Sequence, residues 1–259
     1  MTDHGAHHAD HGERRIVLHP DGPVLASATA ARLVTKLVDV LETRDVAHLV
    51  LTGGTIGIGT LSALAQLPAR EAVDWSRVHL WWGDERFLPS GDKERNETQA
   101  RDALLDSLPL NPEFVHPMAA TDGPDGEDAE AAAERYAAEL AKYAPAGADA
   151  PAFDVLLLGM GPDGHIASLF PEHPGTHEVT PSAIAVHNSP KPPPNRISLT
   201  FRVIQAAREV WVVASGAEKA EAVAKALSGA GQVEVPAAGA RGTQDTLWLI
   251  DRAAATDLP

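Results

Sequence analysis

A histidine and an aspartate lie two residues apart in a glycine-rich segment, and this pair is the leading candidate for chemistry in the chain. The segment reads GMGPDGHIASLFP from residue 159 to residue 171. Three glycines within six residues predict a chain bent into an unusual shape. A histidine exchanges protons near neutral pH because its ordinary pKa is about 6.5. We therefore predict that His165 is catalytic and Asp163 supports it, the alternative being a solvated surface histidine.

A threonine- and glycine-rich turn is the first candidate for anion binding. Its residues are Thr52-Gly53-Gly54-Thr55, between a predicted strand and a predicted helix. Glycine lets the backbone approach a ligand closely, and the first N–H groups of a helix attract anions. The turn is neither a Walker A loop nor a complete G-x-G-x-x-G motif. We predict that Gly53, Gly54 and Thr55 bind phosphate, the alternative being a plain tight turn.

Two carboxylates and a guanidinium follow another predicted strand. They are Asp84, Glu85 and Arg86, in the sequence WWGDER. Adjacent acids can position a hydroxyl-rich substrate, and arginine can bind phosphate through two parallel hydrogen bonds. The alternative is a surface ion pair, which contributes little to the stability of the fold.

A proline-rich segment supplies two further cations. Residues 188–196 read NSPKPPPNR, so Lys191 and Arg196 flank a stiff run of prolines. We predict a substrate-binding loop here. The alternatives are a rigid linker or a polyproline ligand for a partner domain.

Alternating apolar patterns predict the elements that position these segments. We expect an α/β protein with a doubly wound, mostly parallel sheet and helices on both faces. Ligands of such sheets bind outside the carboxyl ends of the strands, where three of the four segments lie. The expected strands are residues 14–18, 47–51, 78–82, 153–158, 183–187, 196–200, 210–214 and 246–250. The expected helices are residues 23–43, a segment after Thr55 that ends at 67, 93–108, 127–143 and 216–227.

Composition restricts the class of protein. The 259 residues carry a formal net charge of −15, which argues against nucleic-acid binding. There is no cysteine, which excludes disulfides and thiolate metal sites. No apolar run approaches the roughly 20 residues that span a bilayer, and the N-terminus does not resemble a signal peptide. We predict a cytoplasmic protein without membrane contact.

The first thirteen residues differ from the rest in composition. They are polar and contain His4, His7, His8 and His11. These histidines would share one face of a helix and could bind a metal, but no apolar residue anchors the segment. We predict a disordered tail at residues 1–13 and a single α/β domain at residues 14–259.

The four segments, in this order, resemble the motifs of the 6-phosphogluconolactonase family. The likeness covers nearly all of residues 14–251, and the Asp-Gly-His loop ending in Ser-Leu-Phe-Pro is its most specific part. The related glucosamine-6-phosphate deaminases carry a glutamate five residues after the histidine, where this chain has Phe170, and often a tyrosine in place of Arg86. Asn96 matches a further lactonase motif, whereas Arg95 stands where that motif has serine.

The resemblance implies a NagB/RpiA-like, Rossmann-type fold and the hydrolysis of a phosphorylated sugar lactone without metal or cofactor. His165 would activate water, and Asp163 would orient it or bind a sugar hydroxyl. The partner would be a small-molecule sugar phosphate lactone, and the protein a monomer or small homo-oligomer. The implied substrate- and phosphate-binding residues are Gly53, Gly54, Thr55, Asp84, Glu85, Arg86, Asn96, Gly161, Gly164, Lys191 and Arg196.

Four other functions each lack a feature that they would need. A serine hydrolase could use Ser168, but the G-x-S-x-G elbow is missing. A glucosamine-6-phosphate deaminase or isomerase would need a relay acid other than Phe170. A sugar-phosphate sensor would normally carry a DNA-binding domain. A metal hydrolase would need a ligand spacing that occurs nowhere outside the first thirteen residues.

Overall fold

Runs of valine, leucine and tryptophan form the central sheet of the computed structural model, which describes residues 12–259. The sheet has six strands in the order β1-β9-β8-β5-β2-β3, and every neighbouring pair is parallel. The strands are β1 (Glu13–His19), β2 (Ala47–Leu51), β3 (Val78–Trp82), β5 (Val155–Gly159), β8 (Glu209–Ala214) and β9 (Asp245–Asp251). The prediction of a mostly parallel central sheet is confirmed.

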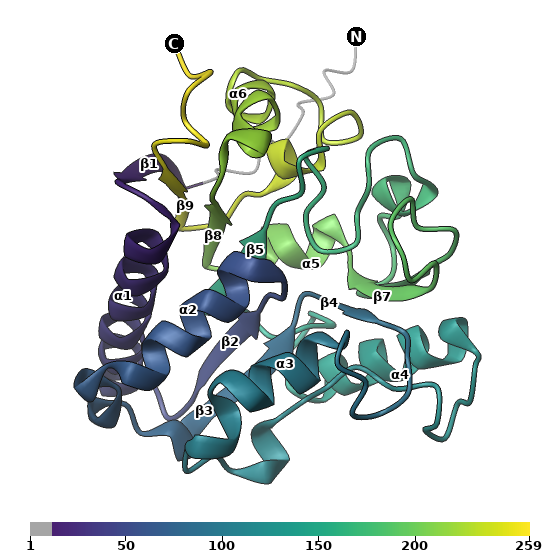
Figure 1. Cartoon of the computed structure of the whole chain (residues 1–259). Coiled ribbons are helices and arrows are strands. Elements are labelled where there is room, and N and C mark those ends of the chain that lie inside the picture. Colours follow the sequence, from purple (N-terminus) through teal and green to yellow (C-terminus); the bar gives the residue numbers. More distant parts are fainter. Residues whose placement is uncertain (1–11) are drawn as a thin grey trace, which may run out of the picture.

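Helices connect the strands and cover the sheet (Figure 1). The longest begins where Asp21 accepts a hydrogen bond from the Val24 N–H and Pro23 occupies the first turn. Helix α1 packs on α2 and α2 packs on α3, whereas α4 packs on a second, smaller sheet. The helices are α1 (Gly22–Thr43), α2 (Gly54–Gln66), α3 (Asn96–Ala103), α4 (Ala129–Lys142), α5 (Phe201–Ala206) and α6 (Ala220–Leu227).

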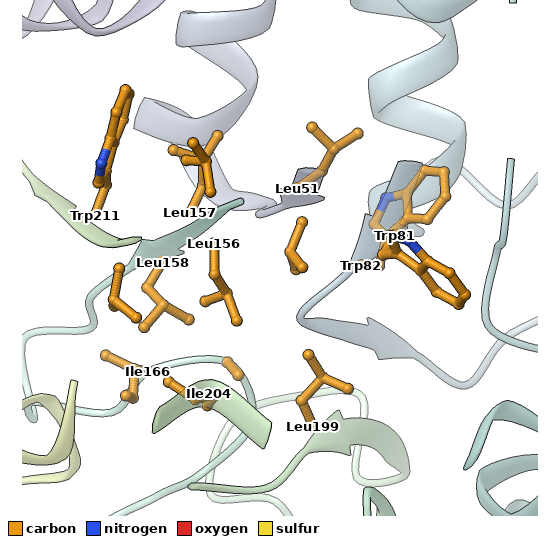
Figure 2. Close-up of a cluster of buried hydrophobic side chains, with 14 of the residues drawn as sticks. Leu51, Trp81, Trp82, Leu156, Leu157, Leu158, Ile166, Leu199, Ile204 and Trp211 are labelled. Atoms are coloured by element: carbon orange, nitrogen blue, oxygen red, sulfur yellow. The ribbon is translucent and has the colours of Figure 1, made fainter. Parts of the chain in front are cut away.

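The central strands are buried on both faces. Figure 2 shows Leu157 and Trp211 pointing to one side of the sheet and Leu156 and Leu158 to the other, where Ile204 lies. All of these side chains are at most 2% exposed. Two-sided burial explains why these segments are apolar throughout and do not alternate with polar residues.

The second sheet was not predicted. It contains β4 (Asp84–Arg86), β7 (Arg196–Leu199) and β6 (Ala183–Val186) in that order, all antiparallel. The strands expected at 183–187 and 196–200 therefore exist, but outside the main sheet. The Asp-Glu-Arg segment is itself a short strand that pairs with β7, so it is held more rigidly than the expected strand-end loop.

Several boundaries differ from the sequence prediction. The helix expected at 93–108 is α3 followed by a 3₁₀ turn at Leu105–Ser107. The helix expected at 216–227 starts after Gly216, whose φ of 105° is not helical, and its first turn is a 3₁₀ turn at Ala217–Lys219. Strand β5 begins at Val155, after Asp154 has turned to accept the N–H of His48. Helix α5 was missed.

The expected N-terminal tail falls mostly outside the described residues, which begin at Gly12. Its last residue, Glu13, belongs to β1 and pairs with Asp245 of β9. One hydrophobic cluster extends from α1 to the C-terminal residues, and on this ground we propose that residues 14–259 form one domain. Within residues 12–259, no helix is both long and apolar enough to cross a membrane.

Three stacked histidines lie beside Trp81 at the β2–β3 side of the sheet. The ring centroids of His48 and His79 are 4.6 Å apart, and those of His116 and Trp81 are 3.8 Å apart. Nδ1 of His79 is 2.9 Å from Nε2 of His116, whose Nδ1 is 3.0 Å from a carboxylate oxygen of Glu139. Burial and the neighbouring histidines lower the pKa of His48 to about 3. Burial and His116 lower the pKa of His79 to about 4.

These low pKa values predict a loss of stability in mild acid. Below its ordinary pKa of 6.5, the unfolded chain protonates His79, whereas the folded protein does so only near pH 4. The free energy of unfolding should therefore fall as the pH falls, by roughly 2 kcal/mol between about pH 7 and about pH 5 from this group alone. Replacing His79→Phe should remove that part of the pH dependence in urea unfolding.

The matched control is His177→Phe, because His177 is exposed in a surface turn. This variant should keep the full pH dependence of the wild type. Equal pH dependence in wild type and His79→Phe would show that the buried histidines do not control acid stability.

Candidate active site

A large cavity opens at the carboxyl ends of the central strands. Its volume is about 960 Å³, and it is lined by residues that lie one or two positions after the ends of β2, β3, β5 and β8. Ten of the thirteen predicted site residues line it: Gly53, Gly54, Thr55, Asp84, Arg86, Asn96, Gly161, His165, Lys191 and Arg196. Segments far apart in the sequence thus meet in one place, as expected for an open α/β sheet.

His165 and Asp163 form a close pair at this cavity. Nδ1 of the histidine is 2.5 Å from a carboxylate oxygen of Asp163, and the His165 side chain is 17% exposed. Because Nδ1 is engaged, Nε2 is the nitrogen left to exchange a proton, and it has no hydrogen-bond partner within residues 12–259. Asp163 does not itself line the cavity. The contact therefore favours the orienting role over hydroxyl binding.

Two glycines explain why this loop has its sequence. A Cβ atom at Gly161 would lie 2.0 Å from Nδ1 of His165 and 2.4 Å from the Asp163 carboxylate. Any other residue would therefore push the pair apart. Gly164 has a φ of 81°, and a Cβ there would meet Val235 at 2.7 Å. Gly164 does not line the cavity, so the structure gives it a part in the shape of the loop and does not place it at the predicted contact with substrate.

The side chain of Lys191 contacts both His165 and Asp163. Its Nζ is 3.3 Å from the Asp163 carboxylate and 3.4 Å from Nδ1 of His165. Burial opposes ionisation of Asp163, but the hydrogen bond from His165 and the charge of Lys191 outweigh it and lower the pKa of this carboxyl. Asp163 is therefore an anion at neutral pH.

The start of helix α2 provides uncapped N–H groups on the cavity wall. Gly53 is the N-cap residue, and no side chain caps the helix. A Cβ at Gly53 would lie 1.9 Å from the side-chain oxygen of Asn96, and Gly54 has a φ of 76°. Thr55 is exposed there. A helix N-terminus of this kind favours an anion.

Asp84 and Asn96 support one another beside this helix. The Asn96 amide donates to the Asp84 backbone carbonyl at 2.8 Å, and both side chains are largely buried although they line the cavity. Asp84 also accepts a hydrogen bond from Ser168 at 2.6 Å. The predicted placement of both residues at the site agrees with this geometry.

Glu85 does not reach the cavity, which contradicts its predicted contact with substrate. Its carboxylate is fully buried and accepts the backbone N–H groups of Arg86, Asn96 and Glu97 at 2.7 to 2.9 Å. Burial raises the pKa of Glu85 to about 7, although Arg95 and these N–H groups oppose the shift. The residue caps helix α3 and thereby positions Asn96.

Four cations surround the cavity, and sequence reasoning missed one of them. Lys219 lines it from the 3₁₀ turn after β8, half-buried. Lys219 follows the end of a strand, as the other site segments do. That position in the sequence could have indicated that it belongs to the site. Arg196 is already engaged, because its guanidinium donates to the carbonyls of Lys191, Pro192 and Pro193 and holds the proline-rich loop. Arg86 donates to the Glu94 carbonyl and is only partly buried.

Ser168 and Phe170 bear on the alternative enzymes. Ser168 is fully buried and does not line the cavity, which does not fit a serine nucleophile. Phe170 packs against His165 with ring centroids 4.5 Å apart. An apolar ring thus occupies the position where the deaminases carry a relay acid.

Comparison with known proteins shows the family of this chain. The sequence profile of the glucosamine-6-phosphate isomerases/6-phosphogluconolactonase family matches residues 20–248. The chain is 62% identical to a 6-phosphogluconolactonase of Streptomyces coelicolor over 95% of both chains. It is 52% identical to that of Mycobacterium tuberculosis, over 94% of this chain and 98% of the relative. The 6-phosphogluconolactonase structure from Trypanosoma brucei superposes with a TM-score of 0.83 at 28% identity, covering 96% of this chain and all of that one (100%). The chain belongs to the glucosamine-6-phosphate isomerase/6-phosphogluconolactonase family.

Proposed function

We propose that this protein hydrolyses 6-phospho-D-glucono-1,5-lactone to 6-phosphogluconate, the lactone-opening step of the oxidative pentose phosphate pathway. The observation that carries the proposal is His165, which is paired with Asp163 and lies on the wall of a cavity that also holds an uncapped helix N-terminus and several cations. The identity of 62% to a curated 6-phosphogluconolactonase supports the same activity. The pair supplies proton transfer, and the cationic side supplies binding of a phosphate.

In the proposed mechanism, Nε2 of His165 accepts a proton from a water molecule as its oxygen bonds to the lactone carbonyl carbon. The bond between that carbon and the ring oxygen then breaks, and the imidazolium returns the proton to the departing oxygen. Asp163 keeps the other proton on Nδ1 and stabilises the imidazolium charge. The N–H groups of the glycine loop are candidates to stabilise the oxyanion formed between the two steps.

The phosphate would bind at the start of helix α2, between Gly53, Gly54 and Thr55. Arg86 and Lys219 are the cations best placed to join it, because both line the cavity and neither is fully used by protein contacts. Lys191 and Arg196 have other partners, Asp163 and the proline-rich loop respectively. We therefore assign them to support of the catalytic pair and of the loop, which revises their expected contact with phosphate.

The second candidate is deamination of glucosamine 6-phosphate, since that enzyme shares the family. Phe170 argues against it, because an apolar ring packed on His165 cannot relay a proton. A sensor that binds without turnover would not need the His165–Asp163 pair. Turnover of glucosamine 6-phosphate, or binding of the lactone without hydrolysis, would favour these alternatives. We further propose that the protein acts in the cytoplasm as a monomer or small homo-oligomer.

Removing the catalytic base tests the mechanism. We expect His165→Ala to lower kcat/KM by about 10²- to 10⁴-fold, the usual contribution of a positioned acid–base. Asp163→Asn should have a smaller effect, because it leaves His165 in place but changes the tautomer that the pair favours. The measurement is proton release in a pH-stat from freshly generated lactone, with the enzyme-free rate subtracted. Full activity of His165→Ala would exclude this histidine as the base.

Removing a phosphate-binding cation should weaken substrate binding more than catalysis. We expect Lys219→Met to raise KM by about tenfold or more while kcat changes less, since a hydrogen bond to a charged group contributes about 1.5–3 kcal/mol. Lys142→Met is the control, because Lys142 lies at the end of α4 and outside the cavity lining. An unchanged KM in Lys219→Met would place the phosphate elsewhere in the cavity.

A further inference from the structure

The segment from residue 159 to residue 171 carries His165 and Asp163, and it also contains Ser168, whose hydroxyl group has no part in the proposed mechanism. Ser168 is fully buried, and its hydroxyl donates to Oδ2 of Asp84 across 84 residues of sequence at 2.6 Å. A buried hydroxyl this close to a carboxylate makes a strong, charge-assisted hydrogen bond. The bond joins the loop that carries His165 to the strand that carries Asp84.

The backbone around Ser168 is shaped to make this contact. Ala167 has a φ of 47°, a left-handed conformation that costs a residue with a Cβ atom free energy. Ala167 and His165 line the cavity, whereas Ser168 does not. The Ser168 N–H then donates to the hydroxyl of Ser198, which lies opposite Asp84 in the pairing of β4 and β7. Two hydrogen bonds thus hold Ser168 next to the carboxylate of Asp84.

The two oxygens of Asp84 differ as a result. Oδ2 is occupied by the Ser168 hydroxyl, whereas the contact of Oδ1 is with the Asn96 amide at 3.5 Å, the limit of a hydrogen bond. Asp84 lines the cavity although it is only 7% exposed. One oxygen is therefore anchored in the protein, and the other retains unused capacity to accept a hydrogen bond.

The chemistry of a carboxylate determines what Asp84 can bind. It repels phosphate and accepts hydrogen bonds from hydroxyl groups. The cations around the cavity account for the phosphate, whereas the ring hydroxyls of a sugar lactone need acceptors. We propose that Ser168 is a positioning residue that fixes Asp84 so that Oδ1 accepts a hydrogen bond from one ring hydroxyl of the substrate. This inference rests on the proposed lactonase function and names a specificity determinant within it.

A merely structural serine would stabilise the fold and affect all substrates alike. A positioning serine would matter only for a substrate that carries the hydroxyl bound by Asp84. The two roles are therefore separated by substrates that lack single hydroxyls, namely the 2-, 3- and 4-deoxy forms of the phosphorylated lactone. The experiment measures kcat/KM of wild type, Ser168→Ala and Asp84→Asn on the parent lactone and these three analogues.

We expect wild type to lose about tenfold in kcat/KM on one of the three analogues, the factor that one hydrogen bond to a charged group supplies. Ser168→Ala should lose several-fold on the parent lactone and lose nothing further on that same analogue. Asp84→Asn should show the same selectivity. Ser182→Ala is the matched control, because Ser182 is also a buried serine but lies outside the cavity lining. This control should behave as wild type on all four substrates.

Two results would overturn the inference. One is a Ser168→Ala variant that is unimpaired on the parent lactone, and the other is a loss by the same factor on all four substrates. If Ser168→Ala does not fold, as judged by its thermal melting, Ser168→Cys is measured instead. Its thiol is a weaker hydrogen-bond donor of similar shape, so this variant should show the same selectivity with a smaller loss of kcat/KM. Failure of wild type to hydrolyse the parent lactone would instead refute the proposed function itself.

Discussion

Parallel pairing of buried strands is the constraint on which the site depends. Strands β2, β5 and β8 point the same way and are covered on both faces, so their carboxyl ends meet at one edge. The chain must leave the sheet at that edge, and polar groups are tolerated there because they are no longer packed between layers. Thr52, the glycine loop before His165 and Ser215 all lie at such ends and line one cavity. Catalysis is thus placed by the same packing that makes the protein stable.

An acidic protein that binds a phosphate ester must gather cations at the binding site and pair the nearby carboxylates with other groups. The net charge is −15, yet Lys191, Lys219, Arg86 and Arg196 all line the cavity. Nearby acids are given other partners: Glu85 caps helix α3, and Asp163 is held by His165 and Lys191. Buried carboxylates with fixed donors do not have to reorganise when a substrate arrives, which favours a preorganised site.

The second sheet connects the loop that carries His165 to the rest of the cavity wall. Pairing of β4 with β7 places Asp84 opposite Ser198, and Ser198 accepts the backbone N–H of Ser168. Arg196, at the start of β7, holds the proline-rich loop that carries Lys191 and lies 5.5 Å from the ring of Phe170. A sheet of only three short strands therefore positions several groups around His165, the proposed base.

The sequence alone determined the strands of the main sheet, the family and most of the residues that line the cavity, because these depend on local signals. Apolar runs indicate buried strands. Gly53, and Gly161 and Gly164 near His165, stand where a Cβ atom would have no room. What only the tertiary structure decided is which polar groups face the cavity. Glu85 and Asp84 are neighbours in sequence, but one caps a helix and the other lines the cavity, since adjacent strand residues point to opposite sides. The sequence alone could not show that Ser168 is buried against Asp84 and Ser198, because these partners are set by packing and not by spacing.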